Sequence, residues 1–133
     1  MKKEKSCGVV IFKEDKVLLV HQNGGNWSFP KGHVEENETE YETAIRETKE
    51  ETNVDVRIID GFRKVITYSP KENVMKDVVL FIGVPISNDL IKQDCEIQEL
   101  RYVSYDEAVE LLDRYNDLKE VITEAFDFYK KIA

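Results

Sequence analysis

Three carboxylates in the middle of the chain have a spacing that would let them act together. Glu47, Glu50 and Glu51 stand at i, i+3 and i+4, and at about 100° per residue a helix places them on one side. Like charges at this spacing destabilise a helix by about 0.2–0.5 kcal/mol per pair, and Lys49 projects from the far side. Because Mg²⁺ is bound through a few carboxylates, waters and substrate phosphates, a cation site is one explanation. A solvated acidic helix surface is the other.

The segment in front of these carboxylates carries groups that suit phosphate. It runs from Trp27 to His33 and contains Lys31 and Gly32. Lys31 and His33 could contact phosphate oxygens, and Gly32 lets the backbone approach a ligand closely. These residues favour a metal and phosphate site over a plain acidic surface.

The helix that must carry the carboxylates is predicted over residues 40–52. Thr39 followed by Glu42 fits a capping box, and Glu40 falls on the acidic side. The adjoining side of the helix holds small or apolar residues that are expected to face a core. These are Tyr41, Ala44, Ile45, Thr48 and Thr52.

The same region follows a longer pattern of fixed spacing. It reads Gly32, five residues, Glu38, seven residues, Arg46-Glu47-Thr48-Lys49-Glu50-Glu51, one residue, Asn53-Val54. This resembles the Nudix box, which has a glycine, these same charged residues and a final glycine before an aliphatic residue. Thr48 stands at a position that is usually aliphatic. Asn53 replaces the final glycine, and Asn is the next-best residue for the left-handed conformation required there.

The resemblance implies a fold, a reaction and roles for the box. Nudix proteins hydrolyse nucleoside diphosphates linked to another group, and their fold is an α/β/α sandwich around a mixed sheet. By this resemblance Glu47, Glu50 and Glu51 would hold Mg²⁺, with Mn²⁺ as an alternative, and Gly32 would lie at the metal site. Arg46 would position a box glutamate through a charge-assisted hydrogen bond. The metal would activate a water that attacks phosphorus.

One further box residue has two readings. Glu38 would either support the loop or belong to a second metal site. The box alone does not separate these roles.

Residues outside the box resemble one subfamily, the asymmetrical diadenosine tetraphosphate hydrolases. By that resemblance His33, Lys31 and Lys76 would contact the polyphosphate, and Tyr68 would stack on an adenine. Glu96 would be a further catalytic carboxylate, as metal ligand or general base, and the choice of base between Glu51 and Glu96 stays open. The segments that carry the resemblance are 27–35, 59–62, 67–68, 76–82 and 96–102.

Each of these residues outside the box also has a structural explanation. Tyr68 could be a packing aromatic at a strand end, Lys76 a solvated turn lysine and Glu96 an ordinary loop carboxylate. Lys71 could take the phosphate role of Lys76, and Trp27 is expected to be buried in packing.

Three functions follow from these resemblances. The first is asymmetrical cleavage of diadenosine tetraphosphate into ATP and AMP. The second is pyrophosphohydrolysis of another nucleotide, such as an oxidised nucleoside triphosphate, a nucleotide sugar or an RNA 5′ end. The third is a non-catalytic nucleotide sensor, which is disfavoured because no box carboxylate is missing.

The remaining sequence predicts one Nudix domain over residues 1–133, a common size for a single domain. The net charge of −8, from 27 acidic and 19 basic residues, opposes nucleic-acid binding. No apolar run approaches the roughly 20 residues of a membrane helix, and no secretion signal begins the chain. Cys7 and Cys95 form no CxxC pair, which favours a reducing compartment and a cytoplasmic protein. We expect a monomer or weak dimer.

The predicted strands and helices do not alternate regularly along the chain. This pattern favours a mixed sheet with helices on its faces. Residues 13–16 are expected to be a hairpin turn, residues 60–61 a strand end, residues 69–76 a turn-rich connection and residues 87–94 a polar loop. The predicted strands are 6–12, 17–21, 27–29, 54–59, 62–68, 77–84 and 100–103, and the predicted helices are 40–52, 105–112 and 118–132.

Overall fold

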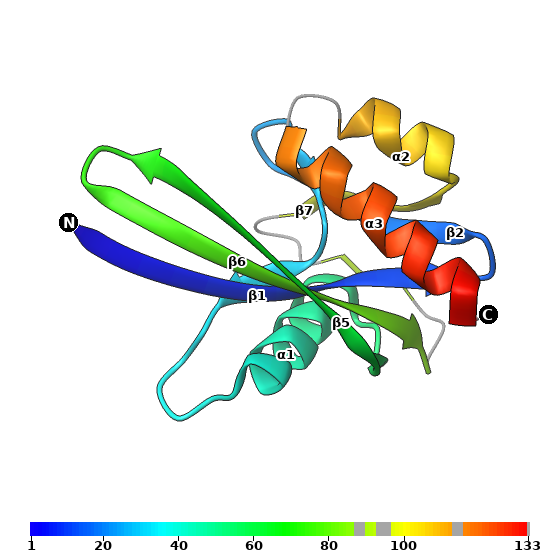
Figure 1. Cartoon of the computed structure of the whole chain (residues 1–133), viewed down its shortest axis with the longest axis horizontal. Helices are drawn as coiled ribbons and strands as arrows, with labels where there is room; N and C mark the ends of the chain where they lie inside the picture. The colour runs from blue at the N-terminus through cyan, green and yellow to red at the C-terminus, as the bar shows by residue number, and fades with distance from the viewer. Residues whose placement is uncertain (87–89, 93–96, 113–115, 133) are drawn as a thin grey trace.

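The computed structural model describes residues 1–86, 90–92, 97–112 and 116–132. Its strands are β1 Lys2–Lys13, β2 Lys16–Gln22, β3 Trp27–Ser28, β4 Lys31–His33, β5 Val56–Lys71, β6 Val74–Pro85 and β7 Ile97–Val103. Its helices are α1 Glu40–Thr52, α2 Tyr105–Leu111 and α3 Asn116–Ile132. Figure 1 shows a long strand group that projects on one side, with α1 and α3 lying against its other end.

The strands form a mixed sheet organised around β1. The order is β3-β2-β1-β6-β5, with β4 also paired to β1 and β7 also paired to β2. β1 runs parallel to β6 and antiparallel to β2 and β4. The hairpin of β1 and β2 is confirmed, with Phe12 opposite Val17. Because β1 lies at the centre, any group on it is held by neighbours on both sides.

The two faces of β1 pack against different helices, since successive side chains of a strand point to opposite faces. Val9 and Ile11 join Ala44 of α1 in one buried cluster. Val10 and Phe12 join residues of α3 in the other, among them Val121, Ile122 and Ala125. The predicted sandwich of helices around a mixed sheet is therefore confirmed.

Helix α1 has the predicted bounds and the predicted caps. The Thr39 hydroxyl accepts a hydrogen bond from the Glu42 N–H at 3.1 Å, and the Glu42 carboxylate accepts one from the Thr39 N–H at 2.8 Å. At the other end Asn53 adopts a left-handed conformation, with φ 66°, and its N–H donates to the Lys49 carbonyl. Asn53 thus ends the helix in the left-handed conformation that a glycine usually adopts at this position.

The buried side of α1 agrees with the prediction in part. Ala44, Thr48 and Thr52 are buried as expected, and Thr43 and Glu51 are buried beside them. Tyr41 and Ile45 are 41% and 40% exposed, although the ring of Tyr41 meets that of Phe81 edge-on. The apolar side of a helical wheel does not say where the sheet lies, and here the sheet covers the small residues next to Glu51.

Two predicted breaks in the sheet are wrong. β5 continues through Asp60 and Gly61, because Gly61 adopts φ 104° within an irregular register between Ile59 and Lys64. A bulge of this kind absorbs residues without ending the strand. Most of the expected connection 69–76 is also strand, and β5 turns into β6 at Glu72 and Asn73, where Asn73 has φ 62°. The long strands of this turn form the projection in Figure 1.

The remaining elements follow the prediction more closely. Helix α2 begins after Ser104, whose hydroxyl accepts a hydrogen bond from the Glu107 N–H. Strand β4 was not predicted, and β1 and β7 begin earlier than expected. Most of the expected loop 87–94 lies outside the described residues.

Candidate active site

Strand β4 brings the box glycine against the box helix. β4 pairs with β1, with Gly32 opposite Cys7. A Cβ atom added to Gly32 would lie 1.9 Å from the Cδ of Glu47, which is far inside van der Waals contact. Only glycine can therefore occupy this position while the Glu47 carboxylate rests on the backbone.

Arg46 gathers the carboxylates of the box. Its Nε donates to Glu38 at 2.6 Å, and its Nη1 donates to Glu47 at 3.0 Å and to Glu50 at 3.1 Å. Its Nη2 donates to the carbonyl oxygen of His33 at 3.0 Å. One guanidinium thus joins the loop, the strand and the helix, and it contacts three box glutamates where the sequence predicted contact with one.

Glu38 lies at the base of this network. Besides Arg46, it accepts hydrogen bonds from the Glu35 N–H at 3.0 Å and the Thr43 hydroxyl at 2.8 Å. Hydrogen bonds from Arg46, Glu35 and Thr43 lower the pKa of Glu38 to about 2. These contacts favour the loop-supporting reading of Glu38.

Glu51 is the buried carboxylate of the helix. It is 4% exposed, and its Oε1 accepts a hydrogen bond from the Lys31 N–H at 3.4 Å. The pKa of the Lys31 amine is lowered overall, chiefly by burial and also by the neighbouring charge of Lys76. Glu51 and Glu47 act in the opposite direction. Two cations and two carboxylates therefore influence one another here.

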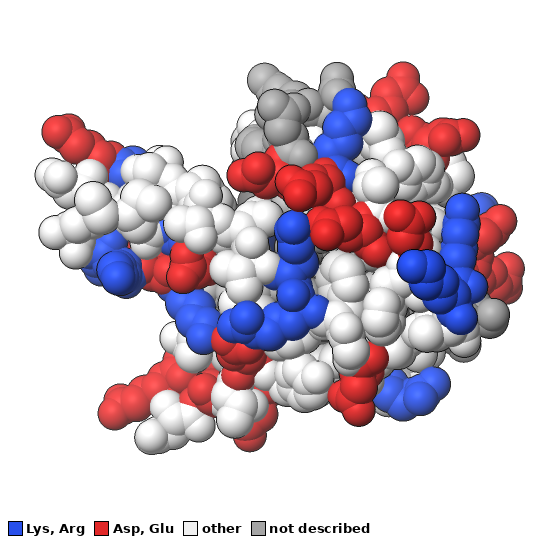
Figure 2. Space-filling model, in the orientation of Figure 1, with Lys and Arg blue, Asp and Glu red and all other residues white. Residues whose placement is uncertain are grey.

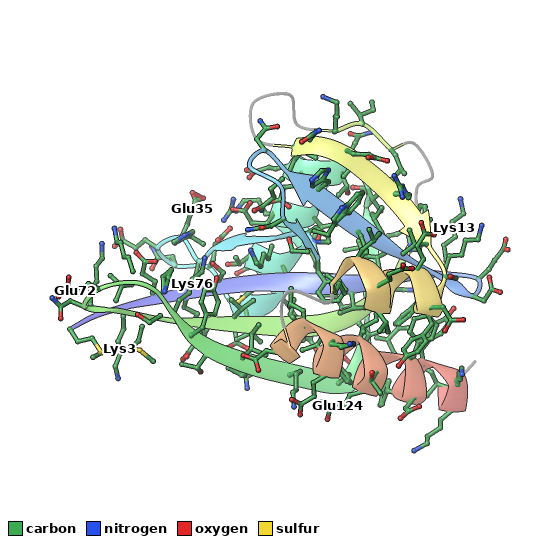
Figure 3. The ribbon with its side chains drawn as sticks, turned by 90° about the horizontal axis from the view of Figure 1, so that it is seen from above. Lys3, Lys13, Glu35, Glu72, Lys76 and Glu124 are labelled. Carbon is green, nitrogen blue, oxygen red and sulfur yellow. The ribbon has the colours of Figure 1, made fainter. Side chains whose placement is uncertain are left out.

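A cavity of about 470 Å³ collects almost all of the predicted site residues. Lys76 reaches it from β6, at the same end of the molecule as Glu35 (Figure 3). Arg46 does not line this cavity, and Lys71 lines neither of the two cavities described here. Glu96 lies outside the described residues. The predicted residues that line the cavity are Lys31, Gly32, His33, Glu47, Glu50, Glu51, Tyr68 and Lys76.

A second cavity, of about 600 Å³, adjoins the first and shares Gln22, Lys31 and Tyr68 with it. Its additional walls come from three distant elements and are mostly apolar. They include Trp27, Ile66, Pro70 and Leu118. Ile66 could have been found from strand alternation, because it stands two residues before Tyr68 on the same face. Leu118 carries no such signal.

Trp27 packs against the hydrophobic core, as the sequence predicted, but it is not fully buried. It is half-buried and forms part of the apolar cavity wall. Its ring stacks on His21, with centroids 4.5 Å apart and planes 10° apart. The guanidinium of Arg101 lies 5.1 Å from the centre of the indole ring. Trp27 is thus held in place by contacts on β2 and β7.

The donor set suits a hard divalent cation. Glu47, Glu50 and Glu51 supply carboxylate oxygens at one cavity, and Mg²⁺ prefers such ligands. Gly32 leaves room for Glu47 against the backbone. Within the described ranges, no three His, Cys, Asp or Glu side chains converge as a ready ligand set. Arg46 contacts two of the carboxylates. The residues fit a cation by their type and because they line one cavity.

Several known proteins are similar to this chain over nearly its whole length. A family model of the NUDIX domain matches residues 2–126. The asymmetrical bis(5'-nucleosyl)-tetraphosphatase of Sus scrofa is 32% identical, over 97% of both chains. The one of Mus musculus is 30% identical, over 93% of this chain and 94% of its own. A solved structure of a C. elegans Ap4A hydrolase binary complex has a TM-score of 0.88 and 25% identity, covering 96% of this chain and 98% of its own.

Proposed function

The chain belongs to the Nudix family of hydrolases, and from that premise we propose that it cleaves diadenosine tetraphosphate asymmetrically into ATP and AMP. The observation that carries this proposal is the pair of adjoining cavities. One is lined by carboxylates and lysines. The other has apolar walls from Trp27, Ile66, Pro70 and Leu118, with Asn26, Ser28 and Asp117 beside them, and Lys31 and Tyr68 belong to both. A polyphosphate suits the first cavity and a nucleobase suits the second. The tetraphosphatases of Sus scrofa and Mus musculus, similar over nearly the full chain, support this substrate.

Members of the Nudix family use divalent cations, and we propose Mg²⁺ for this chain, with Mn²⁺ as an alternative. Glu47, Glu50 and Glu51 would hold it beside Gly32. Glu96, which lies outside the described residues, is proposed as a further carboxylate. Mg²⁺ bound there supplies charge neutralisation on the phosphate oxygens and a water of lowered pKa.

The protein side chains would prepare this site in two ways. Arg46 would hold Glu47 and Glu50 in a fixed direction through charge-assisted hydrogen bonds. Lys31, Lys76 and His33 would bind the anionic phosphates, and catalysis of this reaction depends mostly on such positioning and electrostatics. Glu51 and Glu96 remain the two candidates for the base that takes the proton of the attacking water.

Tyr68 would bind the base from its place between the cavities. It is 37% exposed at the end of β5, so a face of its ring can receive a ligand. Stacking of a nucleobase on an aromatic ring contributes about 1–3 kcal/mol. Trp27, held by His21 and Arg101, would form the opposite end of this binding surface.

The remaining proposals concern the whole chain. We propose one Nudix domain over residues 1–133, in the cytoplasm, as a monomer or weak dimer. No helix in the described ranges is long and apolar enough to cross a membrane.

Burial raises the pKa of the Cys7 thiol to about 11, which keeps it unreactive. On the face in Figure 2, acidic and basic side chains are mixed, which supports a small nucleotide over a nucleic acid.

A substrate panel tests the proposal. Wild-type protein with Mg²⁺ is given diadenosine tetraphosphate, an oxidised dNTP, a nucleotide sugar and a 5′-triphosphorylated RNA, and products are separated by anion-exchange chromatography. We expect kcat/KM for the dinucleotide to exceed the others by at least about tenfold, since only the dinucleotide carries a base at both ends of its polyphosphate and the stacking of one further base adds this much binding. A preference for the dNTP, with release of pyrophosphate, would contradict the proposal.

A further inference from the structure

Ser6 is a polar residue that the fold alone does not explain. It precedes the apolar run from Cys7 to Phe12 on β1 and is 0% exposed. Its hydroxyl oxygen makes no hydrogen bond with any of the described residues. A buried hydroxyl without a partner costs free energy, and buried polar atoms in proteins are nearly always bonded. Alanine would serve the sheet better at this position.

The sheet register places the Ser6 side chain next to residues of the candidate active site. Ser6 is opposite His33 on β4 and opposite Val78 on β6. Directly paired residues project from the same face of a sheet. The Ser6 side chain therefore lies on the same face as that of His33, which the proposed function assigns to phosphate binding.

The adjacent rows of the same face carry the other proposed binding residues. One row further along, Lys76 is paired both with Glu4 on β1 and with Tyr68 on β5. In the other direction, Gly8 is opposite Lys31. A side chain at position 6 is thus surrounded by Lys31 and Lys76, one row away on either side.

Ser6 also lines the cavity of about 470 Å³ together with Lys31, His33 and Lys76. A hydroxyl group rotates to suit its partner and can donate one hydrogen bond. Hydrogen bonds to charged oxygens are about twice as strong as neutral ones. A phosphate oxygen held between the two lysines would be such an acceptor.

We propose that the Ser6 hydroxyl is a substrate-binding group that donates a hydrogen bond to an oxygen of a bound polyphosphate. The inference rests on the polyphosphate part of the proposed function, and it does not depend on which nucleosides are attached. It gives a reason for a serine at a fully buried strand position, where the free energy lost in the folded protein is recovered when the anion binds.

Thr48 provides a matched control. Its hydroxyl oxygen is the second buried side-chain oxygen without a hydrogen-bond partner among the described residues, and the residue is 0% exposed. Thr48 lines neither cavity. Thr48→Val removes the hydroxyl and keeps the shape, so it reports what the loss of a buried hydroxyl does on its own.

The experiment measures binding of bis(methylene)triphosphate, a triphosphate whose P–C bonds resist hydrolysis, by calorimetry with Mg²⁺ present. For Ser6→Ala we expect binding weaker by about tenfold or more, with a midpoint of urea unfolding equal to or above that of wild type. For Thr48→Val we expect wild-type affinity. Equal affinity of Ser6→Ala and wild type would overturn the proposal. So would an equal loss in Thr48→Val, or no binding of the probe by wild type.

A parallel assay separates this proposal from the proposed substrate. With diadenosine tetraphosphate, Ser6→Ala should raise KM by a similar factor and change kcat less. If wild type does not cleave the dinucleotide but Ser6→Ala still weakens triphosphate binding, the role of Ser6 holds and the proposed substrate is wrong. If the dinucleotide is cleaved and Ser6→Ala binds triphosphate normally, the proposed function holds and the role of Ser6 is wrong.

Discussion

The two adjoining cavities are built in different ways. The carboxylate cavity takes its glutamates from α1 and its glycine from β4, a stretch from Gly32 to Glu51. The apolar cavity takes its walls from Trp27, Ile66 and Leu118, on β3, β5 and α3. The glycine and glutamates of the first belong to one segment of sequence, although Ser6, Gln22, Tyr68 and Lys76 complete its wall from other strands. The second exists only after the sheet and α3 have assembled. The comparison suggests that a short segment supplies the reaction and that distant residues fit the substrate.

The largest effect is expected from Glu51 in the carboxylate cavity. Glu51→Gln keeps the shape of the side chain and removes its charge, so kcat should fall by about 10²–10³-fold, the usual loss for one electrostatic group of an active site. Affinity for a non-hydrolysable dinucleotide should change much less. Steady-state hydrolysis and calorimetry measure the two quantities.

Glu72→Gln is the control for this prediction, because Glu72 is exposed in the turn between β5 and β6, at the far end of the projection (Figure 3). It should retain wild-type kcat. If kcat of the Glu51→Gln protein stays within threefold of wild type, the reaction does not take place in the carboxylate cavity.

The next largest effect is expected from Arg46, whose guanidinium is proposed to orient the carboxylates. Arg46→Lys keeps the positive charge but loses the planar fork that contacts Glu38, Glu47 and Glu50. Loss of a group that orients metal ligands costs about 10–100-fold in activity or metal affinity. We expect a higher Mg²⁺ concentration for half-maximal activity, measured by metal titration of the hydrolysis rate. An unchanged titration curve would show that Arg46 has no positioning role.

A smaller effect is expected at the border of the two cavities. Tyr68→Ala should raise KM for diadenosine tetraphosphate by about tenfold, which corresponds to the lower part of the range for base stacking, and should leave kcat within about threefold. Tyr68→Phe retains the ring and should behave like wild type. Equal KM values for all three proteins would mean that the base lies elsewhere.

The smallest effect concerns the stability of α1 away from both cavities. Glu40 bonds to Arg63 at 2.8 Å and pairs with Lys5 at 2.6 Å, and hydrogen bonds from Arg63 chiefly lower its pKa to about 2. A lowered folded-state pKa stabilises the protein above the ordinary pKa of the group, and the contribution is lost as pH falls toward the folded value. After allowance for solvent screening, Glu40→Gln should cost about 1 kcal/mol at pH 7.

That difference should shrink between about pH 4.5 and pH 2, as the wild-type carboxylate becomes protonated. Urea unfolding at pH 7, 4 and 3 measures it, and kcat at pH 7 should be unchanged. A difference that grows on acidification would contradict the assigned ion pair.

The parts of the molecule that were predictable are those governed by local sequence. The capping box of Thr39 and Glu42 and the left-handed Asn53 lie within or beside α1, so their geometry follows from residues a few positions apart. The site residues in the box lie at fixed helical spacings for the same reason. The contact of Arg46 with Glu38 needed the loop to fold back, and only its general form could be foreseen.

The parts that were missed depend on which strand lies beside which. The position of Ser6 beside the cavity follows from its register with His33 and Val78. This register cannot be derived from the spacing of residues in the sequence. Ile45 was wrongly assigned to the core because a helical wheel gives a direction around the helix and not the position of the sheet. Gly61 was read as a strand end, although a left-handed glycine can equally form a bulge.

The most direct test of the proposed reaction is the product pattern from diadenosine tetraphosphate. Wild-type protein with Mg²⁺ is followed by anion-exchange chromatography from the first few per cent of conversion. We expect ATP and AMP in equal amounts, no ADP, and neither product from Glu51→Gln on the same timescale. Release of two molecules of ADP per substrate would contradict the proposed asymmetrical cleavage. So would a dinucleotide that stays intact while the protein releases pyrophosphate from a dNTP.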